Sequence, residues 1–113
     1  MQIQERKIGG VNVIELQLAP HTRNDYSAFQ QLVRAYLARG EQRLIVNLAG
    51  CDWIDSAGLG ELINALVHTM RQGGSLKLAA VPHKVKAILA VTNLTQVFDI
   101  YENEQAALDS FAR

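Results

Sequence analysis

The sequence predicts a single α/β domain, residues 1–113, with a mixed sheet of four to five strands and about four helices. Its 113 residues, 49% of them hydrophobic, suffice for one hydrophobic core and are too few for two. The run LIVNL at residues 44–48 is almost continuously apolar, which is typical of a strand buried in a parallel sheet. Beyond the first two strands, helical and strand patterns alternate, so crossovers of this length imply parallel, right-handed connections.

The first two strands are expected to form a hairpin. Residues 2–7 predict a weak strand at a sheet edge, Gly9 and Gly10 a turn, and residues 11–18 a second strand. One face of the second strand is more apolar than the other, because two sets of residues alternate along it: Ile14, Leu16 and Leu18 against Val13, Glu15 and Gln17.

A loop at residues 19–24 leads into the first predicted helix, which runs from about Asp25 or Ser27 to Arg39. Gly40 is a suitable stop at its carboxyl end. The helix carries an apolar stripe at helical spacing: Phe29, Leu32, Val33, Tyr36 and Leu37.

The central strand is predicted at residues 43–48, and a connection through residue 54 leads to the clearest amphipathic helix, which ends near Arg71 before Gly73 and Gly74. This helix has its own predicted buried stripe: Leu59, Leu62, Ile63, Leu66 and Met70.

The last third of the chain predicts a strand, a helix, a strand and a helix. The strands are expected at residues 75–80 and 97–101. The helix between them begins at Pro82, where proline is tolerated. Its inward positions are Val85, Ile88, Leu89 and Thr92. The final helix, residues 102–111, is expected to be held by Ala107, Leu108 and Phe111.

The start of the amphipathic helix is the candidate functional stretch. Asp55 and Ser56 stand where the first helical N–H groups need side-chain acceptors. Gly58 and Gly60 are poor helix formers, so two of them in the first turns indicate either close approach of a partner or tight packing on the sheet. A helix N-terminus accommodates an anion, and a phosphate on Ser56 would add nearly two negative charges. A plain helix cap is the alternative.

The stretch DSAGLG at residues 55–60 resembles the signature of the STAS domain family, specifically the bacterial anti-sigma factor antagonists. The resemblance spans nearly the whole chain. It includes LIVNLAG at 44–50, GGSLKL at 73–78, Val85, Leu89, TNL at 92–94, FDIY at 98–101 and EQAAL at 104–108. It implies a small sheet with the helices largely on one side and the motif at the start of the second helix.

The resemblance also implies a role. Ser56 would be the phosphorylation site, and Asp55, Ser56, Ala57, Gly58, Leu59 and Gly60 would contact a partner. Unphosphorylated protein would bind an anti-sigma factor that is itself a serine kinase of the histidine-kinase-like ATPase type, and so free a sigma factor or another output. The kinase would phosphorylate Ser56 to end binding, and a PP2C-type phosphatase would reverse this. The chain would then be no enzyme and need no cofactor.

Several positions depart from the family pattern or lie beside the motif. Ala57 replaces a second hydroxyl residue, which leaves Ser56 as the acceptor. Asn47 stands where relatives commonly have Asp, and the acidic residue expected near the end of the second strand comes late, as Asp25. Cys51 is expected to fill a small apolar slot as an inert buried thiol. Trp53 is either partly exposed beside the motif or a core anchor.

Two other classes of function are weighed against this one. A constitutive STAS accessory subunit of a lipid ABC transporter would use Ser56 only as a cap. A hydrolase elbow needs Gly-x-Ser-x-Gly, but the residue two before Ser56 is Ile54, and no Gly-Lys-Ser/Thr phosphate loop is present. A metal site is disfavoured because the histidines show no ligand spacing: His21, His68 and His83.

The bulk properties exclude further classes. The formal net charge is +0, so no basic excess exists to bind nucleic acid. No apolar run approaches a membrane span, and the polar N-terminus lacks the layout of a signal peptide. We therefore expect a cytoplasmic protein without membrane insertion. The chain has one cysteine, Cys51, so no internal disulfide is possible.

Overall fold

Five strands form one sheet in the order β1-β2-β3-β4-β5 in a computed structural model that describes residues 1–18 and 24–112. Their bounds are β1 Gln2–Ile8, β2 Val11–Gln17, β3 Arg43–Gly50, β4 Ser75–Ala79 and β5 Asp99–Tyr101. β1 pairs with β2 antiparallel through a turn with positive φ at Gly9 and Gly10, and every other pairing is parallel. The predicted hairpin and the predicted mixed sheet are both confirmed.

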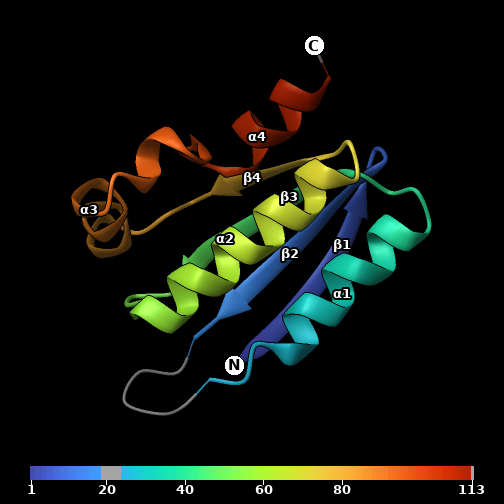
Figure 1. The fold of residues 1–113 in the computed structure, drawn as a ribbon. Helices are drawn as coiled ribbons and strands as arrows, with labels where there is room; N and C mark the ends of the chain where they lie inside the picture. The colour runs from blue at the N-terminus through green and yellow to red at the C-terminus, as the bar shows by residue number, and fades with distance from the viewer. Residues whose placement is uncertain (19–23, 113) are drawn as a thin grey trace.

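Three helices cover one face of the sheet and the last helix covers the other (Figure 1). The bounds are α1 Ser27–Ala38, α2 Ser56–Arg71, α3 His83–Val91 and α4 Glu104–Phe111, with a 3-10 turn at Leu94–Gln96. The larger core joins α1, α2 and α3 to strand residues such as Val46, and the smaller core joins α4 to Ile45. Neighbouring residues of β3 thus face opposite cores, which explains its continuous apolar run.

β2 is buried on both faces, which the alternation in its sequence did not indicate. Val13 and Ile14 are both 0% exposed, with Ile14 in the larger core and Val13 in the smaller one. Ala107 of α4 contributes to the smaller core, and Leu108 and Phe111 pack against it, so the predicted hold on the last helix is correct. α4 therefore covers the face of β2 that a solvated strand would leave open.

Two of the predicted helix stripes are wrong at their carboxyl ends. Met70 is 61% exposed, because Thr69, which is 0% exposed, takes the inward position in the last turn of α2. Thr92 is exposed after α3, and its hydroxyl donates back to the carbonyl of Ile88 at 2.8 Å. The stripe of α1 is confirmed, with Leu32 only partly buried. The last strand is shorter than expected because of the 3-10 turn before it.

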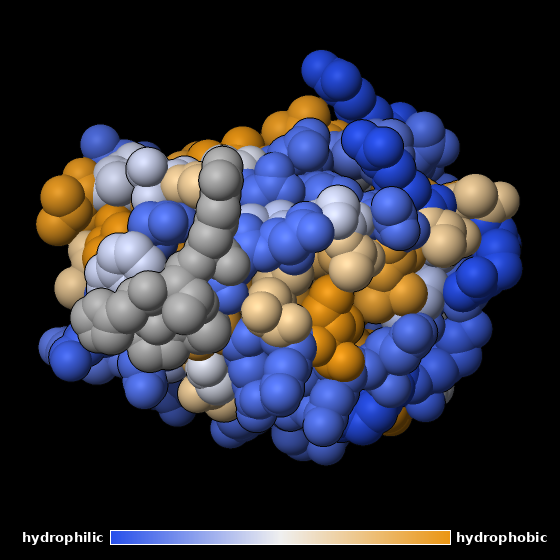
Figure 2. Space-filling view, turned by 90° about the horizontal axis from the view of Figure 1, so that it is seen from below, coloured by the Kyte–Doolittle hydropathy of each residue, from blue (hydrophilic) through white to orange (hydrophobic). Residues whose placement is uncertain are grey.

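The parallel strands place the motif at one end of the molecule. β2, β3, β4 and β5 all end at the same edge of the sheet, and α2 begins at the end of the connection from β3. The molecular surface is largely hydrophilic on the side shown in Figure 2, with an apolar area near its centre. The predicted loop at residues 19–24 and His21 fall largely or wholly outside the described residues.

Candidate functional site

Asp55 is the N-cap of α2. Its backbone is extended, with φ −95° and ψ 179°, and its Oδ1 accepts a hydrogen bond from the backbone N–H of Gly58 at 2.8 Å. This geometry satisfies one of the N–H groups that a helix start leaves without an internal partner. The predicted capping role of Asp55 is therefore confirmed.

Ser56 is the first residue of α2 and is exposed. Its hydroxyl makes no hydrogen bond with the part of the chain that the structure describes. Since Asp55 supplies the side-chain cap, the alternative in which Ser56 serves as that cap is wrong. The Ser56 hydroxyl is thus open to solvent at the positive end of a helix of 16 residues.

The two glycines of the motif serve different purposes. A Cβ on Gly58 would stand 2.5 Å from the Tyr26 hydroxyl oxygen and 2.6 Å from Cγ1 of Ile54, so this glycine is required by packing. A Cβ on Gly60 would meet nothing within 4 Å. Close packing therefore explains Gly58, and Gly60 leaves an open surface on α2.

Ala57 and Leu59 of the motif also differ in burial. Ala57 is exposed, and Leu59 is 9% exposed in the larger core. The side chain of Leu59 therefore serves packing. The exposed motif positions are Asp55, Ser56, Ala57 and Gly60.

Tyr26 connects the start of α1 to the first turn of α2. Burial, with a smaller effect from the Asp55 carboxylate, raises the pKa of Tyr26 to about 12. The hydroxyl therefore stays protonated at neutral pH and packs on Gly58 as a neutral group. The sequence predicted the stripe of α1 and did not indicate that Tyr26 would reach the motif.

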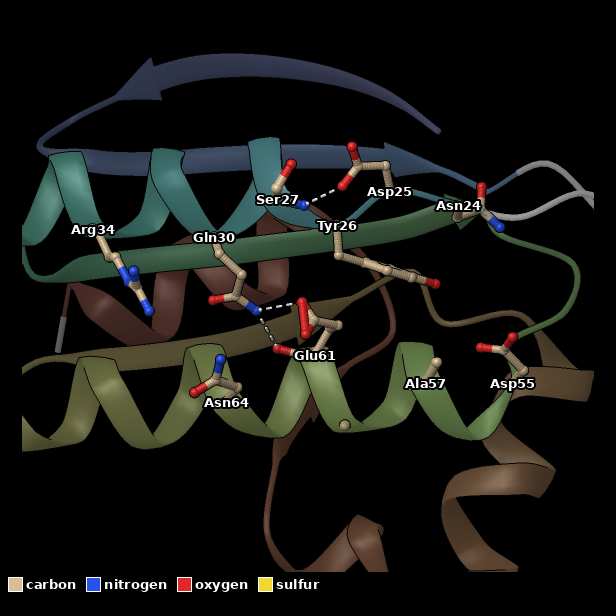
Figure 3. Close-up of a pocket in the computed structure, with 11 residues that line it drawn as sticks. Asn24, Asp25, Tyr26, Ser27, Gln30, Arg34, Asp55, Ala57, Glu61 and Asn64 are labelled. Carbon is tan, nitrogen blue, oxygen red and sulfur yellow. Dashed lines mark hydrogen bonds between the residues drawn. The ribbon is translucent and has the colours of Figure 1, made fainter.

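An open groove of about 1010 Å³ runs between α1 and α2 beside the motif. Gln30 of α1 crosses it, donating from Nε2 to the Glu61 carbonyl at 2.8 Å and to Glu61 Oε2 at 3.2 Å (Figure 3). Ser56 is not among the lining residues, but both its neighbours are. The lining side chains that carry an amide, carboxylate or guanidinium group are Asn24, Asp25, Gln30, Arg34, Asp55, Glu61 and Asn64.

Sequence reasoning missed most of the groove. It placed Asp25 near the site only by resemblance, and it did not single out Gln30, Arg34, Glu61 or Asn64. Helical spacing could have grouped Gln30 with Arg34, and Glu61 with Asn64, on one face of each helix. Nothing in the sequence fixes how the two helices lie against each other.

Asn47 lies in a polar network on the α4 side of β3. Its Nδ2 donates to Oε2 of Glu104 at 2.8 Å, and its Oδ1 accepts from the backbone N–H of Ala49 at 2.9 Å. Arg6 donates two hydrogen bonds to Glu104, at 2.6 and 2.7 Å, and these bonds are the main cause of the lowered pKa of Glu104. An amide at position 47 can donate to Glu104, whereas a carboxylate there would repel it.

Cys51 and Trp53 precede the motif in different environments. Cys51 is 0% exposed, donates to the Leu16 carbonyl at 3.2 Å, and has its pKa raised by burial to about 11, as expected of an inert buried thiol. Trp53 is 48% exposed, so of its two alternatives the partly exposed one is correct.

Neither a metal site nor a membrane span is found in the described part of the chain. No group of three or more His, Cys, Asp or Glu side chains there is placed to hold a metal ion. None of the helices there is long and apolar enough to cross a bilayer.

A family model for the STAS domain matches residues 3–107. A candidate anti-sigma factor antagonist from Thermotoga maritima is 30% identical over 78 residues, which cover 69% of this chain and 69% of that protein. A crystal structure of a candidate anti-sigma factor antagonist from the same organism has a TM-score of 0.85 at 23% identity, covering 98% of this chain and 95% of that one. The Bacillus cell fate determinant SpoIIAA in its phosphorylated form has a TM-score of 0.73 at 16% identity, covering 97% and 99%. At these identities the two structures establish a shared fold.

Proposed function

Because the chain belongs to the STAS domain family, we propose that it is an anti-sigma factor antagonist in a partner-switching pathway. Unphosphorylated protein binds an anti-sigma factor that is also a serine kinase of the histidine-kinase-like ATPase type, and so releases the target of that factor. Phosphorylation of Ser56 abolishes binding, and a PP2C-type phosphatase restores it. The chain is then a ligand and a substrate rather than a catalyst, and ATP belongs to the kinase.

The observation that carries this proposal is the state of the Ser56 hydroxyl. It is exposed and makes no hydrogen bond with the described residues, while Asp55 provides the side-chain cap. A kinase can therefore reach it without breaking a structural contact. Further support comes from SpoIIAA, a protein of the same fold for which a phosphorylated form has been solved.

Electrostatics and solvation explain how one phosphate can end binding. Phosphoserine carries about −1.5 to −2 charges at neutral pH, and Ser56 directly follows the exposed Asp55 in the chain. The positive end of α2 tolerates the charge in the free protein. A partner surface packed closely on the Ser56 hydroxyl has no space for a phosphate and would have to desolvate it, so the complex is weakened.

The test begins with the protein recovered from its native host. Phosphopeptide analysis is expected to find phosphate on Ser56 and not on Ser27, a matched control that is also exposed and first in its helix. Ser56→Ala is expected to retain a soluble kinase in a pull-down, and Ser56→Asp or Ser56→Glu to lose it. Stable association with a transporter ATPase and no phosphate under any growth condition would instead favour the accessory-subunit role in a lipid ABC transporter.

A further inference from the structure

The groove between α1 and α2 has a different charge at each end. Asp25 and Asp55 lie at the end nearest Ser56, and Arg34 and Asn64 lie at the other (Figure 3). The hydrogen bonds from Gln30 to Glu61 lie between these ends. The groove therefore has a direction, from carboxylates to a guanidinium.

The groups at the far end of the groove have no partners in the described structure. Arg34 makes no ion pair or hydrogen bond there, and neither does Asn64, and both are exposed. The cationic side chains that do form ion pairs lie outside the groove, for example Arg39, which pairs with Glu41. Arg34 and Asn64 thus have their full hydrogen-bonding capacity available to an external group.

We propose that this groove receives an extended segment of the partner kinase, an inference that rests on the function proposed above. The segment carries a basic side chain at the carboxylate end, beside Asp25 and Asp55, and an acidic side chain paired with Arg34. Ser27 and Arg34 are seven positions apart on α1, which corresponds to about 10 Å along the helix. At about 3.3 Å per extended residue, the basic and acidic side chains are about three positions apart.

The lining favours a peptide over other ligands. Carboxamides such as those of Gln30 and Asn64 can pair with both the N–H and the C=O groups of an extended backbone. An amphipathic helix would need an apolar groove, and this one is lined mainly by polar side chains. A nucleic acid would be repelled by the carboxylates of Asp25, Asp55 and Glu61 along the groove.

Occupation of the groove would hold the kinase next to the acceptor serine. Ala57 lines the carboxylate end, and Ser56 directly precedes it. Arg34 lies at the opposite end, so it acts on phosphorylation only by positioning the kinase. A groove variant should therefore raise the KM for phosphorylation of Ser56 and leave kcat unchanged.

The experiment uses the kinase identified by capture on Ser56→Ala, purified by itself, and titrated calorimetrically into the full chain carrying Ser56→Ala. Arg34→Glu is expected to weaken binding about tenfold or more, and Asn64→Ala by severalfold. The matched control is Arg71→Glu, because Arg71 is an exposed arginine on α2 outside the groove that forms no ion pair in the described structure. It should change binding by less than about twofold.

Three results would overturn the inference while leaving the proposed function intact. Stronger binding by Arg34→Glu would mean a uniformly basic partner segment. Equal losses for Arg34→Glu and Arg71→Glu would mean a bulk charge effect. Unchanged binding for both, with a loss on replacing the exposed Val67 or Met70, would put docking on the outward face of α2. Failure of Ser56→Ala to retain any kinase would overturn the proposed function itself, and this inference with it.

Discussion

The hydroxyl oxygen of Tyr26 lies 2.5 Å from the point where a Cβ atom on Gly58 would stand. Ile54 closes the same space, with its Cγ1 2.6 Å from that point. Tyr26, the residue before α1, and Ile54, the residue before the cap of α2, thus both pack into the space that a side chain at Gly58 would occupy. This contact sets the carboxylate end of the α1–α2 groove, since Tyr26 and Asp55 both line it.

Gly58→Ala and Gly60→Ala should change stability in opposite directions. Alanine is favoured over glycine in a helix by about 1 kcal/mol, and Gly60→Ala has room to gain most of it. Gly58→Ala forces Tyr26 or Ile54 to move, which should cost about 1–3 kcal/mol of unfolding free energy. Urea unfolding of the two variants measures the difference. Stabilisation by both substitutions would show that Tyr26 does not constrain the helix start.

Asp55→Ala and Ser56→Ala should also differ in their effect on the free energy of unfolding. Asp55→Ala removes the hydrogen bond to the Gly58 N–H and should cost about 0.5–2 kcal/mol. Ser56→Ala removes no hydrogen bond to a described residue, so its unfolding free energy should stay within about 0.5 kcal/mol of wild type. The same urea titrations provide the measurement. A loss for Ser56→Ala as large as that for Asp55→Ala would assign the cap to Ser56.

Asn47→Asp is expected to destabilise the protein. Asn47 is 8% exposed and donates to Glu104, so the substitution places two carboxylates together at the cost of a hydrogen bond. The expected loss is about 1–3 kcal/mol at neutral pH. Repulsion raises the pKa of the new carboxyl above its unfolded value, so the folded variant binds more protons and its deficit should shrink as pH falls. A deficit independent of pH would rule out charge repulsion as the cause.

Glu104→Gln tests the other side of this network. The hydrogen bonds from Arg6, and then that from Asn47, lower the pKa of Glu104 in the folded protein. Its contribution is therefore present above the unfolded pKa, about 4.3, and is lost as pH falls through the lower folded value. Because solvent screens this half-exposed pair, wild type should exceed Glu104→Gln by about 1 kcal/mol or less near pH 7.

A pH series of denaturation curves for wild type and Glu104→Gln provides that measurement. The two should converge on acidification. Glu102→Gln is the control, because Glu102 is exposed and pairs with no described residue, and it should match wild type throughout. A difference between wild type and Glu104→Gln that grew toward low pH would contradict the sign of the shift.

The order of strands and helices could be predicted from the sequence because each element has its own periodic pattern. The LIVNL run indicated a strand with two buried faces, and Val46 and Ile45 do face separate cores. The failures lie at the ends of α2 and α3 and in β2, whose second buried face the alternation did not indicate. Met70 continues the apolar spacing of α2, yet it is 61% exposed, because Thr69 takes the inward position in the last turn instead.

The candidate site was only half predictable for a related reason. The cap by Asp55 is a local interaction within three residues, and local sequence specifies it. Gly58 and Gly60 look alike in the sequence, and only the position of Tyr26 makes one of them a packing requirement. The partner of Asn47 is Glu104, 57 positions along the chain, and no local pattern specifies such a pair.

Trp53 should report directly on whether a partner covers the motif. It is the one tryptophan in the chain, it is 48% exposed, and it lies two residues before the α2 cap. Its fluorescence should therefore be accessible to acrylamide in the free protein. Binding of the kinase to Ser56→Ala should reduce the quenching constant by about half or more, because a packed interface excludes water and solute. Ser56→Asp with the same kinase should keep the free value, and Trp53→Phe supplies the background from tryptophans of the kinase. Full protection of Trp53 in both Ser56 variants would mean that the charge at residue 56 does not govern binding.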